Sequence, residues 1–174
     1  MIRSRRLFFS CLALSALIFI ADQFSKNWFT THFTLHEQWP VIPDFFSFVL
    51  AYNTGAAFSF LSSAGGWQRW FFIGLAAVVS LGLVFWLTRL NRTQKLQAVA
   101  LCLILGGAIG NLWDRAFLGH VVDFILVHYK REWFFPAFNI ADIAITVGAG
   151  LMILDTLIHP DHGQKKPAKH EKKA

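Results

Sequence analysis

Residues 96–113 read LQAVALCLILGGAIGNLW, a run without a single charged side chain. A helix of this length can cross the hydrocarbon core of a bilayer, which needs roughly 20 mainly apolar residues. Further apolar stretches lie at residues 7–28, 70–88 and 137–158. The chain of 174 residues is 55% hydrophobic and 15% charged, with a mean hydropathy of +0.48, which excludes an ordinary soluble domain. The sequence therefore predicts an all-α membrane protein with four transmembrane helices.

Basic residues predict the orientation of these helices. They precede the first span, separate the second from the third and follow the fourth, whereas residues 27–68 contain none. Because Lys and Arg favour cytoplasmic loops, we expect both termini in the cytoplasm and residues 27–69 and 114–136 outside it. The first span resembles a signal peptide, but no small-residue cleavage site follows it, so we expect it to be retained.

The chain is predicted to form one domain, residues 1–160, followed by a Lys-rich cytoplasmic tail at residues 161–174. The tail is expected to be disordered and attracted to anionic membrane lipid. It has no aromatic residue on which a base could stack, so no nucleic-acid partner is expected.

The outer loops are predicted to hold a small extracytoplasmic β-sheet and an interfacial segment. Residues 46–53 alternate apolar and polar side chains between turn residues, which indicates a strand on the membrane surface. Asp123 stands in the apolar segment Val-Val-Asp-Phe-Ile, which fits either a strand or an interfacial helical stretch. A carboxylate there needs a partner, and Asp142, Arg115 and Lys26 are the candidates at similar depth.

Asp22 and Lys26 are ionisable residues within the first span. Such residues are costly in a bilayer and generally face a bundle interior or water. Their i,i+4 spacing suits an ion pair that fixes the end of the span, and a catalytic role is an equally open reading.

Polar and small residues line one face of the third span at its outer end. Gly107, Gly110, Asn111 and Asp114 follow a helical i, i+3, i+4, i+7 spacing, with Arg115 beside them. Small residues alone would indicate a packing seam between helices. The polar members require partners from other elements, because polar groups at this depth must be satisfied within the protein.

The fourth span is entered through Asn139 and Asp142, which are i,i+3 neighbours on a small and polar face. If the helix begins near Ala137, Asp142 lies about 7 Å below the outer boundary. A carboxylate at that depth is expected to face the bundle rather than lipid. Asp155, near the other end of the span, is expected to reach the interface by snorkelling.

Two neighbouring carboxyl groups can hydrolyse an amide bond. Sharing one proton, they supply a base for water and an acid for the carbonyl, and such a pair titrates jointly. Asp123 and Asp142 are the candidates. Asn53, Asn111, Asn139 and Arg115 could orient them or hold the tetrahedral oxyanion.

The residues also bear on other chemistries. No serine shows nucleophile-elbow spacing, and zinc ligation by His120, Asp123 and His128 lacks a recognised motif. A proton-coupled transporter that uses the buried carboxylates remains an open alternative from these residues alone. A non-enzymatic membrane scaffold is a third.

Five stretches, in register, resemble the bacterial lipoprotein signal peptidase family, also called type II signal peptidase. The resemblance covers nearly the whole chain except the tail. The matching stretches are residues 22–26 (DQFSK), 53–58 (NTGAAF), 106–115 (GGAIGNLWDR), 121–124 (VVDF) and 138–142 (FNIAD).

The resemblance implies an aspartic endopeptidase that cleaves diacylglyceryl-modified prolipoproteins just before the lipid-bearing Cys. It implies a multi-pass protein of the bacterial inner membrane, with its active site facing the periplasm. No cofactor or metal is expected, and the protein is expected to be a monomer. By this resemblance Asp123 and Asp142 form the catalytic pair, Asn53, Gly55, Gly107, Asn111, Arg115 and Asn139 line or brace the site, and Asp22, Lys26 and Asp114 give structural support.

Overall fold

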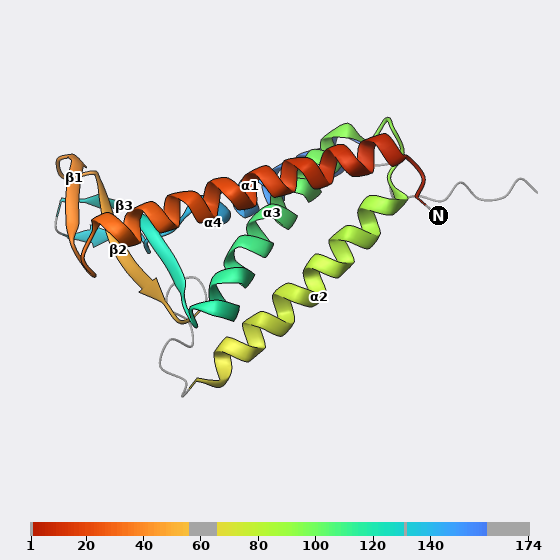
Figure 1. Cartoon of the computed structure of the whole chain (residues 1–174). Helices are drawn as coiled ribbons and strands as arrows, with labels where there is room; N and C mark the ends of the chain where they lie inside the picture. The colour runs from red at the N-terminus through yellow and green to blue at the C-terminus, as the bar shows by residue number, and fades with distance from the viewer. Residues whose placement is uncertain (1, 56–65, 131, 160–174) are drawn as a thin grey trace, which may run out of the picture.

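A computed structural model describes residues 2–55, 66–130 and 132–159, and the predicted tail lies outside these ranges (Figure 1). Within them the chain forms four helices, each long and apolar enough to cross a membrane, and one small sheet, as predicted. The elements are α1 (Arg5–His32), β1 (Gln38–Ile42), β2 (Phe46–Asn53), α2 (Trp67–Arg89), α3 (Lys95–Phe117), β3 (Val121–Tyr129), β4 (Trp133–Phe134) and α4 (Ile140–Ile158).

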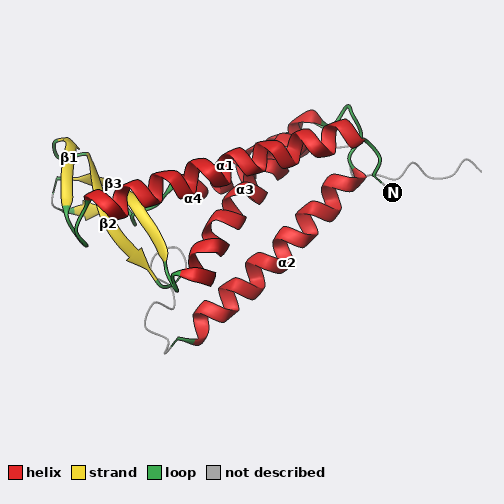
Figure 2. Ribbon diagram, viewed as in Figure 1, coloured by secondary structure: helices red, strands yellow, loops and turns green. Residues whose placement is uncertain are grey.

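Helix α3 is the centre of the bundle. It packs against α4, α1 and α2, and its residues Ala100, Leu101 and Leu105 are almost completely buried. Helices α1 and α2 converge near the N-terminus and diverge towards the sheet, so the bundle opens at that end (Figure 2). The polar end of α3 lies there, beside the sheet.

The sheet is antiparallel, with strand order β1-β2-β3-β4. In the register of β2 with β3, Ala51 lies opposite Asp123 and Asn53 lies opposite Val121. Asp123 therefore stands on a strand, which answers the question that the sequence left open. Apolar side chains of β2, β3 and the C-terminal end of α1 pack together and hold the sheet on the bundle; they are Phe29, Phe33, Leu50, Val122 and Phe124.

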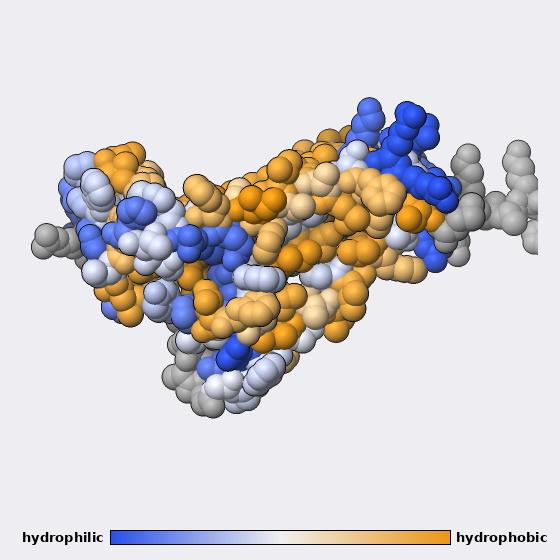
Figure 3. Space-filling view, viewed as in Figure 1, coloured by the Kyte–Doolittle hydropathy of each residue, from blue (hydrophilic) through white to orange (hydrophobic). Residues whose placement is uncertain are grey.

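On the face that Figure 3 shows, hydrophobic side chains cover most of the helical part, and hydrophilic ones gather mainly at the sheet end and at the opposite end. At the end away from the sheet, the backbone N–H of Arg3 donates to the carbonyl oxygen of Thr88 at 2.9 Å and joins the N-terminus to the end of α2. An apolar belt between two polar ends is the surface that a bilayer requires.

Two expectations for the fourth span need correction. Helix α4 begins at Ile140 rather than near Ala137, because Phe138 bridges to Ile125 of β3 and keeps the preceding backbone extended. Asp142 therefore lies in the first helical turn. Asp155 does not snorkel: it is 2% exposed, and its Oδ1 lies 3.2 Å from Nδ1 of His159.

Candidate active site

Asn139 connects the two candidate carboxylates. It is the N-cap of α4, and its Oδ1 accepts a hydrogen bond from the backbone N–H of Asp142 at 3.0 Å. The Asp142 carboxylate accepts in return from the backbone N–H of Asn139 at 3.2 Å, which completes a capping box. The side-chain Nδ2 of Asn139 donates to Oδ1 of Asp123 at 2.7 Å. One buried asparagine thus contacts both carboxylates.

The side chain of Asp123 is almost completely buried. It is 3% exposed, and Asn53 donates to its Oδ2 at 3.3 Å while Asn139 binds its Oδ1. Burial, together with the negative charge of nearby Asp142, raises the pKa of Asp123 to about 7, against the lowering effect of the two amide hydrogen bonds. Such a carboxyl can be protonated near neutral pH.

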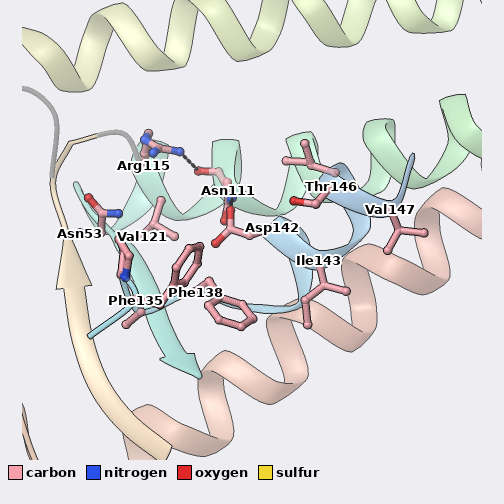
Figure 4. A pocket seen from close by; sticks show the side chains of 13 residues that line it. Asn53, Asn111, Arg115, Val121, Phe135, Phe138, Asp142, Ile143, Thr146 and Val147 are labelled. Atoms are coloured by element: carbon pink, nitrogen blue, oxygen red, sulfur yellow. Dashed lines mark hydrogen bonds between the residues drawn. The ribbon is translucent and has the colours of Figure 1, made fainter. Parts of the chain in front are cut away.

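Asp142 is half-buried, and it faces Asn111 across the contact between α4 and α3 (Figure 4). Nδ2 of Asn111 donates to Oδ1 of Asp142 at 2.8 Å. The position of Asp142 in the first turn of α4 also places its carboxylate where the helix dipole favours a negative charge. The two carboxyl groups therefore share Asn139 but have different environments.

A buried ion cluster, Asp22, Lys26 and Asp114, lies behind this pair. Nζ of Lys26 lies 2.8 Å from a carboxylate oxygen of each aspartate. Asp22 also accepts from the backbone N–H of Ala141 at 2.9 Å, so the cluster joins α1, α3 and α4. The i,i+4 spacing predicted the pair Asp22 and Lys26, and the resemblance grouped Asp114 with them as structural support, but the ion pair of Lys26 with Asp114 was not predicted. The sequence also gave no role to Gln23, which donates to Asp114 at 2.8 Å.

Arg115 and Gly55 fix the sheet side of the site. Nη2 of Arg115 donates to the carbonyl oxygen of Gly55 at 2.9 Å, and the Gly55 N–H donates to Oδ1 of Asn53 at 3.0 Å. The guanidinium lies over the ring of Phe72, 5.2 Å from its centroid. Its buried Nε has no hydrogen-bond partner among the described residues. The Nε–H of Arg115 is therefore a buried donor that is unpaired within the described chain. The rest of the matching stretch, Ala56 to Phe58, lies outside the described residues.

Gly107 does not contact either carboxylate. It lies where α3 meets α4, and a side chain there would collide with the carbonyl oxygen of Ala141 and come within 2.9 Å of Cγ1 of Ile145. The absence of a side chain therefore allows the close helix contact that brings Asn111 to Asp142.

A pocket of about 550 Å³ opens onto Asp142. Its polar lining is Asn53, Asn111, Arg115, Asp142 and Thr146, and Figure 4 shows these side chains on β2, α3 and α4. Most of the wall is apolar, and the sequence did not predict it, because the segment before α4 gave no motif beyond its aromatic residues. The apolar lining is Val121, Phe135, Pro136, Ala137, Phe138, Ile143, Ile145 and Val147.

The histidines considered for zinc have other partners. Nε2 of His128 lies 2.9 Å from Oγ of Ser47, and its Nδ1 lies 2.8 Å from the carbonyl oxygen of Lys130. His120 packs against the ring of Tyr52, with centroids 4.1 Å apart and the ring planes tilted by 32°. The site therefore offers two carboxyl groups with unequal surroundings, which is the arrangement that acid–base hydrolysis needs.

Comparison with known proteins relates the whole bundle to one family. Residues 14–158 match the family model described as Signal peptidase (SPase) II. The lipoprotein signal peptidase of Ectopseudomonas mendocina is 56% identical over 157 residues, which cover 90% of this chain and 92% of that protein. The lipoprotein signal peptidase of Pseudomonas aeruginosa is 58% identical over 144 residues, covering 83% and 85%.

Solved structures show the same fold. A bacterial membrane enzyme determined by the in meso method at 2.3 Å resolution superposes with a TM-score of 0.78 at 30% identity, over 92% of this chain and 94% of that one. A second, at 1.9 Å resolution, gives a TM-score of 0.74 at 31% identity, over 85% of this chain and 92% of that one.

Proposed function

Because this chain belongs to the signal peptidase II family, whose members are membrane peptidases that remove signal peptides from prolipoproteins, we propose that Asp123 and Asp142 carry out the hydrolysis. The observation that carries the proposal is the contact of Asn139 with both carboxylates, beside a pocket that opens onto Asp142. The raised pKa of Asp123 supports the assignment, because one member of an aspartic pair must be protonated while the other is ionised.

The reaction uses water as the nucleophile. The ionised carboxylate takes a proton from a water molecule whose oxygen adds to the scissile carbonyl carbon, and the protonated carboxyl donates to the carbonyl oxygen. The carbon–nitrogen bond then breaks as the leaving nitrogen is protonated. Arg115 lines the pocket, and its guanidinium supplies positive charge and N–H donors for a substrate carbonyl.

The substrate is a prolipoprotein that carries a diacylglyceryl-modified Cys, and cleavage falls just before that residue. The apolar wall of the pocket supports this assignment: Ile143 and Val147 continue from Asp142 along α4, and both are exposed apolar side chains that suit contact with an acyl chain. A lipid-anchored Cys would hold the scissile bond at the depth of Asp142. The enzyme acts as a monomer in the bacterial inner membrane.

The sheet end of the molecule faces the periplasm in this proposal. Basic side chains at the opposite end support it, since Lys and Arg favour the cytoplasmic side. In the described chain they are Arg3, Arg5, Arg6, Arg89, Arg92 and Lys95.

The test is cleavage of a lipidated precursor by the purified protein in liposomes, followed by mass spectrometry. Asp123→Asn and Asp142→Asn should each leave a folded protein that does not release the signal peptide. Asp155→Asn is the matched control, because Asp155 is also a buried carboxylate of this fold but lies at the far end of α4. Normal turnover by either of the first two variants would refute the proposal.

The lipid requirement has its own control. A precursor in which serine replaces the lipid-bearing cysteine should remain uncleaved by the wild-type protein. Equal cleavage of both precursors would refute the substrate assignment and leave the carboxylate pair standing.

A further inference from the structure

Lys26 contacts the active-site network directly. It is 3% exposed, and its Nζ lies 2.8 Å from Asp22, 2.8 Å from Asp114 and 2.9 Å from Oδ1 of Asn111. A lysine ammonium has three donors and no acceptor, so these contacts account for all its hydrogen-bonding capacity. The side chain is therefore fixed on three sides.

Lys26 fixes the orientation of the Asn111 amide together with Asn139, whose Nδ2 donates to the same Oδ1 at 3.3 Å. An amide oxygen and nitrogen are distinguished by their hydrogen-bond partners, and a cation that can only donate requires the oxygen. With Oδ1 of Asn111 held by Lys26, its Nδ2 must point the other way, where it donates to Asp142 at 2.8 Å. The ammonium also polarises this amide and strengthens its donation.

The two carboxyl groups are consequently stabilised to different degrees as anions. Asp142 accepts from the cation-polarised amide of Asn111 and from the backbone N–H of Asn139, at the N-terminus of α4. Asp123 accepts only from the neutral amides of Asn139 and Asn53 among the hydrogen bonds in the described structure, and it is more deeply buried.

We propose that Lys26 is a positioning residue of the carboxylate pair: by fixing and polarising Asn111 it keeps Asp142 ionised, so that the shared proton resides on Asp123. This inference rests on the proposed function, in which the same two carboxyl groups carry out the hydrolysis. It goes beyond structural support for Lys26, because it assigns the roles within the pair.

The proton balance follows from this assignment. Asp142 takes the proton of the attacking water, whose oxygen bonds to the carbonyl carbon, while Asp123 gives its proton to the carbonyl oxygen. As the carbon–nitrogen bond breaks, Asp142 passes its proton to the leaving nitrogen. Asp123 regains a proton from a hydroxyl of the tetrahedral intermediate, so both residues return to their starting state.

The test measures how kcat/KM for the lipidated precursor depends on pH. The charged groups around Asp142 are Asp22 and Lys26 on α1, Asp114 and Arg115 on α3, and Asp123 on β3. Lys26→Met alone would leave two buried carboxylates unpaired and endanger folding. The first variant is therefore the triple change Asp22→Asn, Lys26→Gln and Asp114→Asn, which removes the charges together.

In the triple variant we expect the acidic limb of the kcat/KM profile to lie about one pH unit higher on the pH axis, with little change in KM. Below the limb this equals a roughly tenfold lower kcat/KM. In an Asn111→Ala background the same triple change should produce no further shift, because Lys26 acts through Asn111. An unchanged limb in the folded triple variant would overturn the proposal. So would an equal shift in both backgrounds, which would indicate a direct effect of charge.

A second variant keeps the proposal testable if the triple variant does not fold. Asn111→Asp still offers Lys26 an oxygen, but as an ionised carboxylate it cannot donate to Asp142. We expect it to fold with a wild-type KM, to lose at least about tenfold in kcat and to show a shifted limb. A wild-type rate and limb would contradict the positioning role of Lys26. If Asp123→Asn and Asp142→Asn cleave the precursor normally, the proposed function itself fails. If both are inactive but the acidic limb of the pH profile does not move in the triple variant or in Asn111→Asp, this inference alone fails.

Discussion

Gly107→Ala should reduce cleavage through its effect on helix packing alone. The added methyl group would collide with the backbone carbonyl oxygen of Ala141 and lie 2.9 Å from Cγ1 of Ile145. Because the carbonyl belongs to the backbone of α4, it cannot turn away as a flexible side chain could. Helices α3 and α4 must separate instead.

The size of the effect follows from the contacts. Ordinary van der Waals distances begin at about 3.4 Å, so α4 must move by roughly 1 Å, and Asp142 would draw away from Asn111, now 2.8 Å distant. Misplacing a reacting group by about 1 Å can cost about a hundredfold in rate. Overpacking of this kind costs about 1–3 kcal/mol of stability. We therefore expect a folded protein with a kcat about a hundredfold lower.

The assay is single-turnover cleavage of the lipidated precursor in liposomes, with thermal unfolding in detergent as the measure of folding. Gly150→Ala is the control, since beyond the neighbouring residues and backbone of its own helix no atom of the described chain lies within 4 Å of the added carbon. It also replaces a helical glycine by alanine, so it has the same effect on helix propensity. A wild-type rate for Gly107→Ala, or an equal loss in the control, would refute the packing argument.

Three other expected outcomes follow from the described contacts. The pKa of Asp123 is raised from an ordinary 3.8 to about 7, so its contribution to stability is complete at low pH and is lost as pH rises towards 7, by about 4 kcal/mol in total. Asp123→Asn should remove this loss. The free energy of unfolding of the wild type and of the variant, each measured near pH 5 and near pH 8, checks this, and an equal change with pH in both proteins would contradict it. Asn139→Ala removes a helix cap worth about 1–2 kcal/mol and also the donor to Asp123. Asn139→Ser restores a cap but not that donor, so it should recover the melting temperature but not kcat. Recovery of both would refute the role of Asn139 in linking the two carboxylates. Arg69→Ala breaks hydrogen bonds of 2.8 Å to the carbonyl oxygens of Arg115 and Ala116 and should lower the melting temperature by a few degrees, so an unchanged value would show that these bonds do not stabilise the end of α3.

The helices were predictable because each needs only a local pattern, a run of apolar residues long enough for a bilayer. The polar face of α3 and the spacing of Asn139 and Asp142 were equally local. The capping box was not recognised as the start of α4, because a cap and an interior helical pair have the same spacing of three residues. The extended backbone before Asn139 depends on Phe138 pairing with a distant strand, which the local sequence does not reveal.

The connections between elements were less predictable. The i,i+4 spacing indicated that Asp22 and Lys26 could pair, but it could not show that Lys26 also reaches Asp114 and Asn111 on another helix. The strand of Asp123 was ambiguous because short apolar segments suit both a strand and an interfacial helix. Depth in the membrane made Asp142 one of three candidate partners of Asp123, the family resemblance singled out this pair, and the structure adds the hydrogen bonds through which the two carboxylates are linked.

The most direct test of the central claim asks whether Asp123 and Asp142 act as one unit. Single-turnover rates for the lipidated precursor should be measured with Asp123→Asn, with Asp142→Asn and with both changes together. If the two carboxyl groups share one reaction, the double variant should be no slower than either single variant, because removing one member already abolishes the function of the pair. Losses that multiply in the double variant, or a wild-type rate in either single variant, would contradict the account.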